Sequence, residues 1–307
     1  MAVENLTVVV EFILLGFSEV PNLQGFLFGI FLLIYLSILI GNGLLIFIIK
    51  MDQSLQTPMY FFLGNFSFLE ICYTSVTLPR MLSDLWTQKR TISFLDCAVQ
   101  FCFLYILAGA ECLLLAVMAY DRYVAICKPL YYPLIMNHKV CVQLVVASWM
   151  TGVPLMIEQT YQTFCLNFCG PNKLNHFFCD VAPILELVCG DTYKTEVSVQ
   201  FAAFVFILTP LLLILTSYVK IINTILKLPS TSGRTKAFST CSSHLMVVGL
   251  FYGCAGIVYL QPKSSYSRGS LKVFSLFYAT VTPMFNPLVY SLRNKDVIAV
   301  LKKLLHK

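Results

Sequence analysis

Two glutamates, Glu70 and Glu111, are candidates for a chemical role because each lies inside a long apolar run. An ionised carboxylate in so apolar a setting is costly, and such a residue is expected to serve a function. A sodium ion held between the two carboxylates would relieve both their mutual repulsion and their loss of hydration. Alternatively, one carboxyl group carries a proton. We favour the sodium ion, and the sequence leaves the protonated alternative open.

A second group of interest is the triplet Asp121-Arg122-Tyr123, which follows the apolar run 97–117. That run is long enough to cross a bilayer, for which ~20 apolar residues suffice. The acid and the base of the triplet therefore lie at one face of the membrane. An arginine at this depth can simply anchor a helix by extending to the interface, and for the triplet alone that is the simpler interpretation.

The composition identifies the elements that position these groups. Of the 307 residues, 58% are hydrophobic and 12% are charged, and the mean hydropathy is +0.79, whereas about a quarter of a soluble domain is charged. The apolar runs are unbroken, while strands of membrane barrels alternate over ~10 residues. The fold class is therefore an all-α integral membrane protein. The basic residues behind the net charge of +6 are dispersed at the ends of apolar runs, so they indicate topology and no nucleic-acid partner.

Seven apolar runs are expected to span the membrane. They cover residues 24–49, a run that opens at Pro58, and residues 97–127, 140–157, 197–226, 237–260 and 271–292. Residues 158–195 are expected to form a long ordered loop. The positive-inside rule places the basic ends in the cytoplasm and the N-terminus outside. Residues 1–307 then form one domain, with an extracellular N-terminus (1–23), a helix bundle (24–292) and a cytoplasmic tail (293–307).

Each end of the chain carries a local signal. Asn5-Leu6-Thr7 is a glycosylation sequon on the outer side. In the tail, apolar residues recur at helical spacing among lysines; they are Val297, Ile298, Leu301, Leu304 and Leu305. This pattern predicts a short amphipathic C-terminal helix that lies on membrane lipid.

The chain has twelve cysteines, most of which lie inside apolar runs as small hydrophobic residues. The other five cluster on the expected outer side; they are Cys97, Cys165, Cys169, Cys179 and Cys189. An odd number leaves one thiol unpaired. Any four cysteines allow three pairings, so the cysteine spacing alone does not decide which bonds form.

Five motifs occur in order along the chain, and together they resemble those of one receptor family. They are Gly41-Asn42, Pro58-Met59-Tyr60-Phe61-Phe62-Leu63, the segment 118–132 around the Asp-Arg-Tyr triplet, the segment 236–244 (KAFSTCSSH), and the segment 283–294 (PMFNPLVYSLRN). The chain is similar to odorant receptors of the terrestrial-vertebrate type, within the rhodopsin-like G-protein-coupled receptors. The resemblance covers nearly the whole chain. It implies a seven-helix receptor of the plasma membrane, which binds a small odorant and acts through a stimulatory olfactory G protein to raise cyclic AMP.

The resemblance also implies particular pairings. Cys97 is expected to bond Cys179, and Cys169 to bond Cys189. Glu70 and Glu111 are expected to face the interior of the bundle near Asn42 and Asn286. No enzyme activity and no cofactor other than the sodium ion are expected.

A cytoplasmic switch is expected around Arg122. Its residues by resemblance are Asp121, Arg122, Tyr123, Tyr218, Arg234, Lys236, His244, Tyr252, Asn286, Pro287 and Tyr290. Arg234 stands where some relatives place a glutamate that holds the arginine, so Arg122 needs other partners, for which Asp121, Tyr218, Tyr290 and His244 are candidates. His244 is either a titratable member of this switch or a polar residue satisfied by helix packing. Both interpretations stay open.

A ligand cavity is expected in the outer half of the bundle. One face of the third span repeats at steps of three and four; its residues are Phe101, Leu104, Tyr105, Ala108, Gly109 and Cys112. The other walls are expected from Ala202, Ala203, Phe206, Ala255, Gly256, Tyr259, Ser275 and Ala279. Such a lining suits a small, mostly apolar, volatile ligand held by one or two hydrogen bonds. The alternative is that the small residues serve close helix packing.

A different class of function is also conceivable. A membrane transporter or channel could use Glu70 and Glu111 as an ion path. The segments lack the paired, Pro- or Gly-broken spans in matching halves that are typical of transporters. Ligand-dependent nucleotide exchange on a G protein, compared with ligand-dependent flux into vesicles, separates the two classes.

Overall fold

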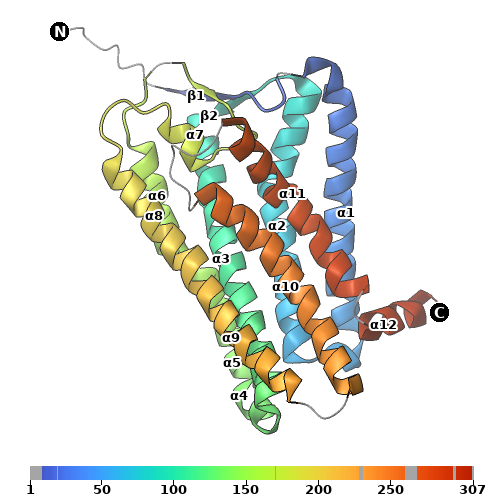
Figure 1. Ribbon diagram of the computed structural model, residues 1–307. Helices are drawn as coiled ribbons and strands as arrows, with labels where there is room; N and C mark the ends of the chain where they lie inside the picture. The colour runs from blue at the N-terminus through green and yellow to red at the C-terminus, as the bar shows by residue number, and fades with distance from the viewer. Residues whose placement is uncertain are drawn as a thin grey trace.

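The computed structural model describes residues 9–18, 20–169, 171–227, 231–259, 268–292 and 295–305. Long helices form one bundle, and Figure 1 shows β1 and β2 with α7 at one end of it and α4 with α12 at the other. The long helices are α1 (Gln24–Met51), α2 (Pro58–Thr87), α3 (Phe94–Cys127), α5 (His138–Met150) continued by α6 (Gly152–Phe164), α8 (Tyr193–Ala203) continued through the π-helix η4 (Phe204–Leu208) into α9 (Thr209–Leu226), α10 (Thr231–Tyr259) and α11 (Arg268–Leu292). The short helices are η1 (Pro21–Leu23), η2 (Gln53–Leu55), η3 (Pro129–Tyr131), α4 (Tyr132–Ile135), α7 (Val181–Leu185) and α12 (Lys295–Leu305).

The helices follow the apolar runs of the sequence. In the part of the chain that the structure describes, six helical segments are long and apolar enough to cross a membrane. They correspond to the first six predicted spans. The seventh, α11, packs against α1, α2 and α10 and completes the bundle. The all-α membrane fold is therefore confirmed.

One predicted boundary is wrong. The fourth span was expected to end at residue 157, yet α6 continues to Phe164. Two polar residues in this extension, Gln159 and Thr163, are buried against the bundle. The helix therefore extends through a polar stretch because those side chains face inward, and hydropathy alone could not show this.

A small sheet covers the end of the bundle at which α3 begins, and the sequence did not predict it. As labels only, we call this end of the bundle the outer end and the opposite end the inner end. Strand β1 (Glu11–Leu14) pairs antiparallel with β2 (Thr91–Ser93) and parallel with β3 (Lys173–Leu174). Phe12 of β1 is fully buried, with its ring against Phe94 and Phe168. We call this sheet, together with the loop between α6 and α8, the roof.

Helix α12 forms as predicted and leaves the bundle beside α1 and α11. Its apolar side is partly used within the protein, because Val297 and Val300 are buried. Lys302 and Lys303 are exposed, and the Lys303 ammonium lies 3.4 Å from the Asp52 carboxylate at the end of α1. The tail helix is thus attached to the bundle on its apolar side and by one ion pair.

Candidate functional site

A cavity of about 60 Å³ lies beneath the roof, between α3, α6, α8, η4, α10 and α11. Ten predicted residues line it: Leu104, Tyr105, Ala108, Gly109, Cys112, Ala202, Ala203, Phe206, Ala255 and Tyr259. Six further lining residues were not predicted: Met156, Gln159, Val199, Ile207, Phe251 and Tyr278. The lining is almost entirely apolar and aromatic, so the cavity suits a small hydrophobic molecule.

Four predicted lining residues lie elsewhere. Phe101 packs in the hydrophobic cluster beneath the sheet of the roof, with its ring 5.6 Å from the ring of Phe164. Ser275 lines a different cavity, which it shares with His176 and Asp180. Ala279 is buried and Gly256 is half-buried, and neither lines the apolar cavity. On α10 the predicted residues Ala255 and Tyr259 face the cavity together with Phe251, and on α11 Tyr278 faces it in place of Ser275 and Ala279.

The π-helix η4 shapes one wall of the cavity. A π-turn inserts an extra residue into a helix and often occurs at functional sites. Here it directs Phe206 toward α3, where a Cβ built on Gly109 would lie 3.3 Å from the Phe206 ring. Gly109 therefore lets the aromatic ring approach α3 closely, and a larger side chain there would have to displace the ring or fill the cavity.

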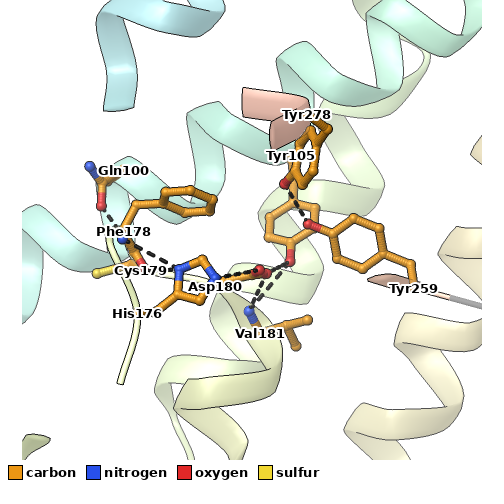
Figure 2. A network of polar contacts seen from close by, with 9 residues as sticks. All are labelled: Gln100, Tyr105, His176, Phe178, Cys179, Asp180, Val181, Tyr259 and Tyr278. Atoms are coloured by element: carbon orange, nitrogen blue, oxygen red, sulfur yellow. Dashed lines mark hydrogen bonds and ion pairs between the residues drawn. The ribbon is translucent and has the colours of Figure 1, made fainter. Parts of the chain in front are cut away.

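The top of the cavity carries a tyrosine network, shown in Figure 2. The Tyr105 hydroxyl donates to the Asp180 carboxylate, and the Val181 N–H donates to the same carboxylate at 2.8 Å. The hydroxyls of Tyr259 and Tyr278 are 2.7 Å apart. These hydroxyls are the polar groups of the cavity lining on α10 and α11.

The roof loop is ordered around His176. Its Nδ1 lies 3.1 Å from the Phe178 carbonyl oxygen, and its Nε2 lies 3.8 Å from the Asp180 carboxylate. Burial lowers the pKa of His176 below its usual 6.5, and this outweighs the opposing attraction of Asp180. The Cys179 N–H donates to the Gln100 side chain at 3.0 Å, which ties the loop to α3.

Two disulfides fix the same loop. Cys97 at the start of α3 is joined to Cys179, with Cα atoms 5.6 Å apart, and Cys169 is joined to Cys189 with Cα atoms 5.8 Å apart. These are the pairings that the resemblance implied. Cys165 is free and exposed.

The two glutamates lie together in the middle of the bundle. Glu70 and Glu111 are both buried, their carboxyl groups interact, and the Asn286 amide donates to Glu70. The Glu70 and Glu111 carboxyl groups lie within hydrogen-bonding reach of each other, and the Asn286 Oδ1 oxygen is buried with no hydrogen-bond partner among the described residues. Oxygen ligands of this kind suit a hard cation, although the described residues contain no cluster of three or more acidic, histidine or cysteine ligands.

Three of the candidate partners of Arg122 also take part in hydrogen bonds of their own. Asp121 accepts a hydrogen bond from Tyr132 at 2.9 Å, and Tyr132 was not among the predicted switch residues. Tyr218 and His244 bond each other, with the Tyr218 hydroxyl 2.8 Å from His244 Nδ1. Arg122 is buried and acts electrostatically on both Asp121 and His244.

The other predicted switch residues lie as follows. The Tyr252 hydroxyl donates to the Cys112 carbonyl oxygen at 2.9 Å. The Lys220 ammonium lies 5.4 Å from the centroid of the Tyr123 ring. Pro287 lies 3.2 Å from a Cβ built on Gly41, so this glycine allows α1 and α11 to pack closely. Arg234 is half-buried. Asn5 and the side chains of Lys236 and Tyr290 lie outside the described residues.

This all-helical membrane bundle has an apolar cavity near one end and the buried residues Asp121 and Arg122 near the other, an arrangement that fits a membrane receptor. The family description for olfactory receptors matches residues 31–307. The chain belongs to the olfactory receptor family.

Similar proteins cover the whole chain. Human olfactory receptor 10AG1 is 59% identical over 297 residues, which are 97% of this chain and 99% of that protein. Human olfactory receptor 10A4 is 53% identical over 305 residues, covering 99% of this chain and 97% of that protein. Mouse olfactory receptor 5AP2 is 49% identical over 303 residues, which are 99% of this chain and 96% of that protein.

Proposed function

We propose that this olfactory receptor binds a small, mostly apolar odorant in the cavity beneath the roof and activates a stimulatory olfactory G protein to raise cyclic AMP. The observation that carries the proposal is the cavity itself, which is lined by apolar and aromatic side chains with tyrosine hydroxyls at its top. Apolar walls with one or two directional polar groups are typical of sites for small hydrophobic ligands.

The proposed orientation puts the N-terminus outside and the C-terminus inside the plasma membrane. Basic residues support it, because those at the α12 end outnumber the acids there. They include Lys50, Lys128, Lys139, Lys220, Lys227, Lys302 and Lys303, set against Asp52 and Asp121. The roof then faces the odorant, and the Arg122 region faces the G protein.

The proposed signal runs along α10. Ala255 and Tyr259 of α10 line the cavity, Tyr252 bonds the backbone of α3, and His244 bonds Tyr218 of α9. A ligand that presses on the outer part of α10 therefore acts on a helix whose inner part is joined to α9 by the Tyr218–His244 hydrogen bond. A ligand shifts this equilibrium only by its preference for one arrangement of α10.

We further propose that a sodium ion occupies the region of Glu70 and Glu111. The two neighbouring buried carboxyl groups of Glu70 and Glu111 and the unpaired Asn286 Oδ1 oxygen support this. Glu111→Gln should reduce the sensitivity of signalling to sodium. Unchanged sodium dependence in a well-expressed Glu111→Gln receptor would favour a shared proton instead.

A cyclic-AMP reporter challenged with a chemically diverse odorant panel tests the main proposal. At least one small apolar odorant should raise cyclic AMP, and the purified receptor with that odorant should accelerate nucleotide exchange on the G protein. Odorant-dependent ion flux into vesicles without nucleotide exchange would contradict the proposal.

A further inference from the structure

A second cavity lies far from the odorant pocket, where α1, α2 and α5 meet. Its volume is about 630 Å³, against about 60 Å³ for the odorant pocket. Its walls are apolar and come from all three helices; they include Ile46, Ile49, Phe61, Phe68 and Cys141. The Phe68 side chain is 53% exposed on the lipid-facing side of the bundle. We call this cavity the side groove.

The end of the side groove nearest the α1–α2 loop has a different character. Exposed polar residues line it: Lys50, Gln56, Thr57 and His138. No acid lines the side groove, and among the described residues no carboxylate forms an ion pair with Lys50. The polar end of the groove is therefore positively charged and has no counter-ion from this part of the chain.

The nearest acid in sequence is already engaged. Asp52 accepts hydrogen bonds from the Ser54 N–H at 2.9 Å and the Ser54 hydroxyl at 2.6 Å, and it pairs with Lys303 of α12 at 3.4 Å. The hydrogen bonds from Ser54 lower the pKa of Asp52. Asp52 therefore stays ionised with partners of its own, and Lys50 remains available to another anion.

We propose that the side groove binds one anionic phospholipid of the leaflet that Lys50 faces. Its headgroup contacts Lys50 and His138, and one acyl chain lies along Ile46, Phe61 and Phe68. A basic pocket between membrane helices is a recognised arrangement for anionic headgroups, and the volume falls within the ~300–1,000 Å³ range of small-molecule sites. Only the assignment to the cytoplasmic leaflet rests on the proposed function; the binding does not.

The arrangement selects this lipid over other occupants. A soluble anion would use Lys50 but not the apolar walls, and a sterol would use the walls but leave the Lys50 ammonium without an anion. A phospholipid satisfies both parts and can diffuse into the groove from the bilayer. By filling the space between α1, α2 and α5, the bound lipid also holds these helices together.

The experiment uses the full-length receptor in nanodiscs that contain phosphatidylcholine, phosphatidylserine and cholesterol in equal amounts. Native mass spectrometry measures the lipid that stays bound, and the receptor should retain phosphatidylserine in preference. Lys50→Gln should lower this retention about fivefold, because one basic side chain near the surface contributes about 1 kcal/mol. Lys173→Gln, which removes an exposed lysine of the roof, is the matched control and should leave retention unchanged.

A second variant tests the apolar part without changing charge. A Cβ built on Gly64 has a single neighbour within 4 Å, the Ile49 side chain at 3.9 Å. Gly64→Leu therefore fits on the backbone, extends into the side groove, and should also displace phosphatidylserine. Equal retention of the three lipids, preference for cholesterol, or full retention of phosphatidylserine by Lys50→Gln or by Gly64→Leu would each overturn the proposal. Cooperative thermal unfolding of Lys50→Gln, Lys173→Gln and Gly64→Leu confirms that the three variants are folded.

Discussion

The outer and inner ends of this receptor are held together by different kinds of interaction. At the outer end, two disulfides, a three-stranded sheet and a cluster of phenylalanine rings fix the roof. At the inner end, the described contacts between elements are side-chain hydrogen bonds and an ion pair, among them Tyr132 to Asp121, Tyr218 to His244, Cys127 to Thr224, and Lys303 to Asp52. A disulfide typically contributes about 2–4 kcal/mol and a hydrogen bond about 0.5–1.5 kcal/mol. The outer end can keep the shape of its pocket while the inner end rearranges.

Breaking the roof should have the largest effect. Cys97→Ser removes the bond between α3 and Cys179 and should destabilise the receptor by about 2–5 kcal/mol. Thermal unfolding of the purified protein and surface expression in cells measure this. Cys165→Ser, which removes a free and exposed thiol, is the control and should behave like the parent. Equal stability of the two variants would show that the disulfide does not hold the roof.

Filling the pocket beneath the roof should remove odorant sensitivity but not folding. Gly109→Leu places a side chain against the Phe206 ring, and overpacking of this kind costs about 1–3 kcal/mol. The odorant concentration for half-maximal cyclic AMP should rise at least about tenfold. Gly249→Leu is a matched control, because a Cβ on Gly249 has no neighbour within 4 Å among the described residues. A Gly109→Leu receptor that reaches the surface with normal sensitivity would exclude Gly109 from the odorant site.

Loosening the inner end should have a smaller effect, on basal signalling. Tyr218→Phe removes the hydrogen bond to His244, which joins α9 to α10. Loss of about 0.5–1.5 kcal/mol should raise basal cyclic AMP by roughly two- to tenfold at equal surface expression. Tyr131→Phe alters an exposed tyrosine at the same end and should leave basal signalling unchanged. A Tyr218→Phe receptor with parental basal activity would show that this bond does not restrain α10.

The smallest expected effect concerns pH at the roof. Burial keeps the pKa of His176 in the folded protein below its usual 6.5. The unfolded chain therefore binds the proton first, and stability should fall as the pH drops below about 6.5. His176→Asn should show a flatter dependence of the unfolding temperature on pH. If the two proteins lose stability in parallel between pH 7.5 and pH 5.5, another group is responsible.

The sequence predicted best what depends on regular spacing. Leu104, Ala108 and Cys112 recur at helical intervals, and they do face the cavity. The carboxylates were found because Glu70 and Glu111 interrupt apolar runs. Both signals are local, so they need no knowledge of the neighbouring helices.

Features that depend on distant partners were missed. Gln159 lines the cavity from a polar stretch that hydropathy assigns to a loop. Tyr132 bonds Asp121 only because α4 folds back against the end of α3. Ser275 was placed on the wrong wall because the rotation of α11 is set by packing, which a single helix does not reveal.

The sheet of the roof also sets an order of assembly. Strand β1 lies near the start of the chain, yet the Asn172 amide that bonds the Glu11 carbonyl comes 161 residues later. At roughly 5–20 residues per second of synthesis, the first strand waits on the order of ten to thirty seconds for this partner. During that interval Phe12 has no Phe168 to cover it. The sheet of the roof therefore closes only after four spans have been made, and the later helices α8, α10 and α11 must still pack beneath it to complete the cavity.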